Sequence, residues 1–99
     1  MNERIHILMV APWSAPKIVT IPNTLEVFQA IVGGLIQAVP LEANVDIICN
    51  EEGKLMRLPP NRRVGWDIIF GTFLVVGVSG ENFDSLPDEK VAQYMDLFS

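Results

Sequence analysis

The sequence predicts an α+β fold: a mixed or antiparallel sheet of about six strands with two helices, in the order β-β-α-β-β-β-β-α. Two observations indicate this class. Short runs rich in Val, Ile, Leu and Met recur along the chain and end at Pro, Gly or Asn, as strands and their turns do. Two other segments carry apolar residues at helical spacing. The 99 residues have room for one hydrophobic core, so residues 1–99 are expected to form a single domain.

Two strands open the chain. Residues 5–11 form an apolar run that Pro12 stops, because proline has no N–H to donate to a sheet. Residues 17–21 are β-branched at almost every position, and Pro22 ends them. A short loop that carries Trp13 should join the two strands.

Residues 24–33 predict the first helix. Asn23 is the expected N-cap, and Glu26 can reach back to it. The apolar residues of one helical face are Leu25, Phe28 and Val32. Gly33 and Gly34 end the helix, because glycine takes the left-handed conformation without a Cβ clash.

Four further strands are expected between the helices. The runs 35–41 and 45–50 are each about one strand long. Residues 50–53 suit a type I turn, after which 54–58 should return as a short strand. Residues 67–78 give the strongest pattern, because a nearly continuous apolar run is typical of a strand buried on both faces.

The last expected element is a helix that packs on the sheet. Ser85 is its predicted N-cap, and Pro87 stands in the first turn, where a missing N–H costs little. The residues of its packed face are Val91, Tyr94, Met95 and Phe98.

Charge and composition exclude several classes of protein. The net charge of −5 argues against binding of extended nucleic acid, which needs clustered Lys and Arg. A single cysteine, Cys49, allows no internal disulfide and fits a reducing compartment. No signal peptide opens the chain, and no apolar run approaches the roughly 20 residues that span a membrane. We therefore expect a cytoplasmic protein with no membrane contact. The apolar fraction of 49% is high for a small monomer and favours a homo-oligomer.

Few residues could carry catalysis or bind a metal. His6, the only histidine, lies mid-strand, and Cys49 lies in an apolar run where a core position is the simpler interpretation. A reactive thiolate needs an open, electropositive setting. One Cys and one His do not make a zinc site, and the carboxylates lack the spacing of a calcium loop. We therefore expect a non-enzymatic protein with no catalytic residue, metal or cofactor. A small hydrolase using Cys49 or His6 is the weakest alternative.

The segment 50–66 has the pattern neither of a core element nor of an ordinary connecting loop. Four of the seven basic residues lie in it: Lys54, Arg57, Arg62 and Arg63. Guanidinium groups bind phosphate or carboxylate through paired hydrogen bonds, and the Pro59-Pro60 pair stiffens the backbone before them. The predicted ligand-binding residues are Asn50 and Asn61 for orientation, Lys54, Arg62 and Arg63 for phosphate contacts, and Trp66 for stacking.

Two other interpretations of this segment stay open. Arg62 and Arg63 could pair with internal carboxylates, and Trp66 could belong to the core or to an oligomer contact. The carboxylates nearest in sequence are Glu51, Glu52 and Asp67. Alternatively, the segment could bind a protein, with the exposed aromatics Trp13 and Trp66 as anchors.

Four blocks of sequence carry a family resemblance: "LEVFQAIVGGLIQAVPL", "NEEGKLMRLPPNR", "DIIFGTFLVVG" and "FDSLPDEKVAQYMDLF". They resemble a family of small proteins of bacteriophages, mobile elements and their hosts, catalogued as a domain of unknown function (number 3846). The resemblance runs from about Lys17 to Phe98 and leaves out the first strand and Trp13. It implies a phage or mobile-element accessory protein, with no catalytic residues. The family's polar blocks, and a glycine of the later strand, fall on Asn50, Glu51, Gly53, Lys54, Leu58, Pro59, Asn61, Arg62 and Gly71.

The predicted function is that of a non-enzymatic accessory protein. It would bind a small anionic, nucleotide-like ligand through the 50–66 hairpin and loop, in or near a subunit interface, and could sequester a host defence signal. The alternative is a protein-interaction module that inhibits or redirects a host protein. The expected partners are therefore a small anionic ligand or a host protein, together with further copies of the chain.

Overall fold

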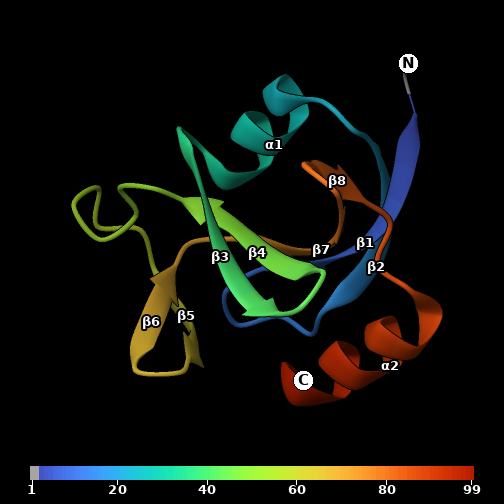
Figure 1. Ribbon diagram of the computed structural model, residues 1–99. Helices are drawn as coiled ribbons and strands as arrows, with labels where there is room; N and C mark the ends of the chain where they lie inside the picture. The colour runs from blue at the N-terminus through green and yellow to red at the C-terminus, as the bar shows by residue number, and fades with distance from the viewer. Residues whose placement is uncertain (1–2) are drawn as a thin grey trace.

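The computed structural model describes residues 3–99 and confirms the α+β class. Two strands, a helix, a run of strands and a final helix follow one another as predicted (Figure 1). The elements are β1 (Arg4–Val10), β2 (Lys17–Pro22), α1 (Leu25–Val32), β3 (Ile36–Glu42), β4 (Val45–Asn50), β5 (Pro60–Val64), β6 (Asp67–Phe70), β7 (Phe73–Ser79), β8 (Asn82–Asp84) and α2 (Asp88–Leu97).

The main sheet has six strands, and every pairing in it is antiparallel. Its spatial order is β2-β1-β7-β4-β3, and β8 pairs with the end of β7. The first five residues of β7, Phe73 to Gly77, are buried, as the continuous apolar run predicts for a central strand. The strands β5 and β6 form a separate hairpin beside this sheet.

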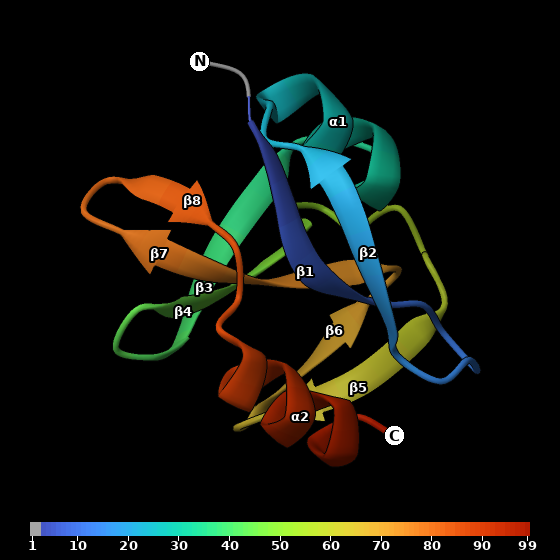
Figure 2. The same ribbon diagram turned by 90° about the vertical axis from the view of Figure 1, so that its right-hand side faces the viewer.

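The sheet separates two apolar clusters, because successive side chains of a strand point to opposite faces. Helix α1 covers one face with Phe28 and Val32, and α2 and the β5–β6 hairpin lie on the other (Figure 2). The buried strand residues on the α1 side are Ile5, Ile7, Ile48, Leu74 and Val76. Those on the α2 side are Leu8, Val10, Val45, Ile47, Cys49, Ile69, Phe73 and Val75.

Helix α1 is capped one residue later than predicted. The Thr24 side chain accepts a hydrogen bond from the Val27 N–H at 3.3 Å. Asn23 does not act as the cap, because its Nδ2 donates to the Phe83 carbonyl oxygen at 2.9 Å and so ties the helix start to β8. The predicted stop at Gly33 is confirmed, since this residue has the left-handed conformation with φ of 85°.

Helix α2 packs through the predicted face but begins differently. Its N-cap is Pro87, with no side-chain hydrogen bond. The Ser85 hydroxyl, which was expected to cap the helix, instead accepts a hydrogen bond from the backbone N–H of His6 at 2.9 Å. It therefore links the segment before α2 to strand β1. Tyr94 and Phe98 are buried in the cluster on this face of the sheet.

An ion pair fixes α2 to the edge strand β3. Lys90 Nζ lies 2.8 Å from Glu42 Oε2, and the Tyr94 hydroxyl donates a hydrogen bond to Glu42 Oε1. The hydrogen bonds from Lys90 and Tyr94 lower the pKa of Glu42. Burial, together with the bond to Glu42, raises the pKa of Tyr94 to about 12.

The predicted strand 54–58 is wrong, because these residues form consecutive turns. We call residues 51–58 the turn loop. Backbone groups of its later residues bond within the loop, with the Met56 N–H donating to the Glu52 carbonyl oxygen at 2.9 Å and the Leu58 N–H to that of Gly53 at 3.0 Å. They are therefore not available to a neighbouring strand. The arginines that were expected in a loop, Arg62 and Arg63, lie on strand β5 instead.

The predicted strand 67–78 is divided into β6 and β7 at Gly71 and Thr72. Gly71 has φ of 87°, and a Cβ at this position would lie 2.8 Å from Leu58 Cδ1. Its N–H donates to the Pro59 carbonyl oxygen at 2.7 Å. The glycine thus lets the chain turn close against the end of the turn loop, and the hairpin leaves the sheet at this point.

Within residues 3–99, neither helix combines the length and the apolar character that crossing a membrane requires.

Candidate functional site

The predicted binding segment folds as the turn loop followed by the β5–β6 hairpin, which lie side by side at one end of the sheet (Figure 1). A surface cavity of about 190 Å³ lies between these two elements and strands β3 and β4. Its lining residues are Gln37, Val39, Cys49, Asn50, Glu51, Gly53, Lys54, Val64, Asp67, Ile68, Ile69 and Phe70. Of the predicted residues, only Asn50 and Lys54 reach this cavity.

Asn50 holds the turn loop to the end of α1. Its Oδ1 accepts from the Glu52 N–H at 2.7 Å, and its Nδ2 donates to the Val32 carbonyl oxygen at 3.1 Å and to Met56 Sδ at 3.6 Å. The residue is 5% exposed. Both ends of the amide therefore have partners inside the protein, as buried polar groups require.

Asn61 and Arg62 form a second network, away from the cavity. Asn61 Nδ2 donates to the carbonyl oxygens of Val10 at 2.9 Å and Gly71 at 2.8 Å. Arg62 Nη1 donates to Asn61 Oδ1 at 2.8 Å. The same guanidinium donates from Nε to the Phe98 carbonyl oxygen at 2.9 Å and from Nη2 to that of Ser14 at 2.7 Å. The acceptors of this guanidinium are therefore backbone carbonyl oxygens and the Asn61 amide oxygen, and not carboxylates.

The remaining cations of the segment, Lys54, Arg57 and Arg63, are exposed. The pairing that the sequence left open between the arginines and nearby carboxylates does not occur, because Lys90 and Glu42 form the one ion pair within residues 3–99. Lys54 nevertheless shares the cavity wall with two carboxylates, those of Glu51 and Asp67. The cavity is therefore mixed in charge.

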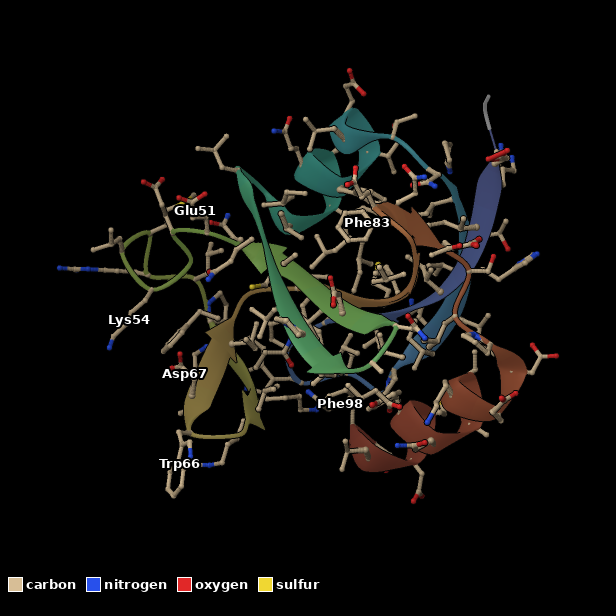
Figure 3. The ribbon with its side chains drawn as sticks, in the orientation of Figure 1. Glu51, Lys54, Trp66, Asp67, Phe83 and Phe98 are labelled. Carbon is tan, nitrogen blue, oxygen red and sulfur yellow. The ribbon has the colours of Figure 1, made fainter. Side chains whose placement is uncertain are left out.

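Trp66 lies at the tip of the hairpin and points away from the sheet (Figure 3). Its side chain is 100% exposed, which excludes a place in the core. The turn before β6 uses Gly65, with φ of 62°. Ile68, two residues after Trp66, is 39% exposed. Arg63 lies directly opposite Ile68 across the hairpin. These three side chains make up what we call the hairpin face.

Comparison with known protein families identifies the chain. The family model described as "Domain of unknown function (DUF3846)" matches residues 5–99. The chain belongs to this family. The match also takes in the first strand and Trp13, which the resemblance seen in the sequence had left out. Neither the curated proteins nor the solved structures gave a match.

In this DUF3846 protein, Cys49 lines the cavity, and its surroundings favour the neutral thiol. It is 4% exposed, and its Sγ lies 3.7 Å from the Gln37 carbonyl oxygen, to which it donates. Burial, and secondarily the charge of Asp67, raise the pKa of the thiol, whereas a nucleophile needs a lowered pKa. His6 is exposed on β1, where its Nδ1 lies 2.7 Å from Thr20 Oγ1.

Metal-ligating side chains do not gather anywhere in the described part of this DUF3846 chain: no three of His, Cys, Asp and Glu between residues 3 and 99 lie close enough to hold an ion.

Sequence reasoning missed the part that β3 and β6 play in the cavity of this DUF3846 protein. Gln37 and Val39 line it although they lie far from the basic residues in the sequence, and Ile68 lines it although it was expected in a strand buried on both faces. The apolar residues of "DIIF" (Asp67–Phe70) predicted a strand, but no local signal in the sequence indicates that the hairpin turns back over β3 and β4. The exposure of Leu55, at 82%, was also not foreseen, because the segment 54–58 was expected to be a strand.

Proposed function

We propose that this DUF3846 protein is a non-enzymatic protein-interaction module, and that it binds a partner protein through the hairpin face. The observation that carries the proposal is the complete exposure of the Trp66 side chain. A solvated indole stabilises nothing in the folded chain, whereas Trp is among the residues that most often dominate binding energy at interfaces. Ile68 and Arg63, which face each other across the same hairpin, supply a further apolar contact and a charge.

The backbone that carries the anchor is held in place, which favours binding. The turn at Gly65 closes a paired hairpin, and the hairpin is attached to the body of the protein by Asn61, which bonds the ends of β1 and β6. A backbone on such a scaffold loses little conformational freedom when its side chain binds a partner. We infer that the partner presents an apolar pocket wide enough for an indole.

A pull-down with the purified chain tests this function. Three bait proteins are immobilised on a resin: wild type, Trp66→Ala and the matched control Trp13→Ala. Each is incubated with lysate of the cells that carry the gene, and the retained proteins are quantified by mass spectrometry. We expect a partner that wild type and Trp13→Ala retain and that Trp66→Ala loses, with an unchanged melting temperature for the variants. Equal retention by Trp66→Ala, or no specifically retained protein, would overturn the proposal.

The second candidate is a small anionic, nucleotide-like ligand, which the cavity beside Lys54 favours. Its volume of about 190 Å³ is below the roughly 300 Å³ at which typical ligand sites begin, so it would take a phosphate or one ring of such a ligand. Arg62, Asn50 and Asn61 have internal partners. Arg63 does not line the cavity, so this function rests on Lys54 and stands second.

The family resemblance gives this second candidate its biological context. In a phage or mobile element, a cytoplasmic protein of this kind would sequester a nucleotide signal of host defence. Thermal-shift measurements with mononucleotides and cyclic dinucleotides test it, since a ligand at 100 times its Kd adds about 2.7 kcal/mol to the free energy of unfolding. We expect Lys54→Ala to remove the shift and Arg57→Ala, on the same loop but outside the cavity lining, to retain it. A panel without any shift would end this candidate.

A further inference from the structure

The two edges of the main sheet differ in how they meet solvent. Strands β2 and β3 are the outermost strands. Along an antiparallel ladder, hydrogen-bonded residue pairs alternate with pairs whose backbone groups point outward. On β3, the Glu51 N–H donates to Leu35, so Ile36, Ala38 and Pro40 have the outward positions. Pro40 has no N–H, and the register shifts between Pro40 and Glu42. Both features protect a sheet edge from further pairing.

The edge of β2 is regular and open over its centre. The Asn23 N–H donates to Glu3, while His6 bonds away from β2, to Ser85 and Leu86. Since Thr20 is the partner of His6 and Ile18 that of Leu8, the backbone groups of Ile18 and Thr20 point outward. Figure 2 shows β2 beside β1 at the margin of the sheet.

The residues around β2 form a pattern that is symmetric about Val19. One position away on either side are Ile18 and Thr20, which carry the outward backbone groups. Three positions away are Pro16 and Pro22, which have no N–H. Six positions away are Trp13 and Leu25, whose side chains are 81% and 53% exposed. Such symmetry suits antiparallel pairing of the strand with a second copy of itself across a two-fold axis.

We propose that this protein forms a two-fold dimer in which β2 of one copy pairs with β2 of another, centred on Val19. In this register Ile18 of each copy faces Thr20 of the other, and both pairs exchange two backbone hydrogen bonds. A shift by two residues in either direction sets a proline opposite Ile18 or Thr20, and the carbonyl oxygen of that residue then has no N–H from which to accept a hydrogen bond. The prolines therefore select one register and end the ladder, which prevents open-ended growth of the sheet.

A second copy fits this edge better than an unrelated strand, because the apolar residues complement each other across the axis. The Trp13 end of one β2 lies beside the Leu25 end of its partner. Ile18, which is 57% exposed, faces Thr20 in the new ladder. Three of the exposed large apolar side chains, Trp13, Ile18 and Leu25, thereby gain neighbours. The mean hydropathy of +0.32, high for a small monomer, accords with such burial. The dimer does not depend on the hairpin face.

Analytical ultracentrifugation of matched variants tests the edge. Ile18→Pro removes an outward N–H from β2, and Ala38→Pro removes the equivalent outward N–H from β3. We expect Ile18→Pro to raise the dimer dissociation constant about tenfold or more, since two intermolecular hydrogen bonds are lost, and Ala38→Pro to leave it unchanged. A monomeric wild type, or a dimer that Ile18→Pro does not weaken, would overturn the proposal.

Disulfide trapping tests the register in chains that keep the edge intact. The two Val19 Cα atoms would lie about 4.5 Å apart at the axis, within the range of about 4.4–6.8 Å that a disulfide spans. The two Lys17 Cα atoms would lie about 13 Å apart. We expect Val19→Cys to form a covalent dimer under mild oxidation and Lys17→Cys not to. Equal cross-linking of both variants, or none at Val19→Cys, would contradict this register and with it the proposed interface.

Discussion

A hydrogen bond between Arg62 and Phe98 links strand β5 to the end of α2: Nε of Arg62 donates to the Phe98 carbonyl oxygen at 2.9 Å. Phe98 is the C-cap of α2, where unpaired carbonyls and the helix dipole favour a cation. The same guanidinium reaches the Ser14 carbonyl oxygen at 2.7 Å. One side chain thus holds together the end of α2, the hairpin and the loop between β1 and β2.

Arg62→Ala should therefore destabilise the protein. Three hydrogen bonds from a charged group disappear, and the carbonyls of Phe98 and Ser14 lose their donor. We expect a loss of about 2 kcal/mol in the free energy of unfolding, because the group is only partly buried. Urea denaturation followed by circular dichroism measures the change.

The neighbouring arginine provides the control. Arg63 is exposed and lies on the same strand, so Arg63→Ala should change the free energy of unfolding by less than about 0.5 kcal/mol. Arg62→Lys keeps the charge but not the planar fork of donors, and we expect it to restore only part of the stability. If Arg62→Ala were as stable as Arg63→Ala, the linking role of Arg62 would be refuted.

The fold was predictable where a local pattern reports burial. Strands β1, β4 and β7 have apolar runs bounded by proline, glycine or asparagine, and these runs suffice because most of their residues are buried. Strand β2 has no buried residue and was predictable from its β-branched composition. Residues 54–58 were expected to be a strand because residues 50–53 suit a hairpin turn, whereas the chain continues in turns after Gly53. The apolar residues Leu55 and Met56 are exposed there, so their apolar character gave no information on burial.

The site was less predictable, because its contacts join distant parts of the chain. Asn50 was expected to begin a turn, and its bond to the Glu52 N–H confirms this local part. The bond between Arg62 and Phe98 spans 36 positions, and no nearby residue signals it. Charge alone indicated an anion-binding arginine, whereas the fold presents backbone carbonyls to it. Whether Lys54 and Arg63 bind a ligand stays a prediction.

Phe98→Ala should be among the most destabilising substitutions near the end of the chain. The ring is buried, stands edge-on to Phe73 with centroids 5.3 Å apart, and stacks on Tyr94 at 6.0 Å. Removing a buried aromatic side chain typically costs about 3–5 kcal/mol. Thermal denaturation should show a much lower melting temperature. Leu97→Ala is the matched control, because Leu97 is 63% exposed, and a comparable loss there would contradict this account of the packing.

Glu42 should make stability depend on pH on the acid side. Its pKa is lowered by the hydrogen bonds from Lys90 and Tyr94, so the folded state favours the ionised form. That stabilisation is present above the ordinary pKa of 4.5 and is lost as the pH falls through the lowered value. Glu42→Gln should therefore flatten the dependence of the melting temperature on pH below about 4.5.

A carboxylate without partners provides the comparison for Glu42. Glu81 is exposed in the turn between β7 and β8 and belongs to no ion pair within residues 3–99. We expect Glu81→Gln to keep the wild-type acid profile. A Glu42→Gln profile that parallels wild type at every pH would show that the link between β3 and α2 does not contribute.

Tyr94 allows the same link to be read from the alkaline side. It is the only tyrosine of the chain, so the absorbance of tyrosinate reports this one hydroxyl. Burial, followed by the hydrogen bond to Glu42 and its charge, raises the pKa to about 12. The neutral hydroxyl is favoured in the folded state, so its stabilisation is complete below pH 10 and is lost as the pH rises toward 12. We expect a titration midpoint near 12 in the native protein and near the ordinary value of about 10 in urea. Glu42→Gln should lower the native midpoint, because the hydroxyl no longer faces a carboxylate. A midpoint near 10 in the native wild-type protein would mean that the hydroxyl is open to solvent and that the hydrogen bond between Tyr94 and Glu42 does not hold α2 to β3.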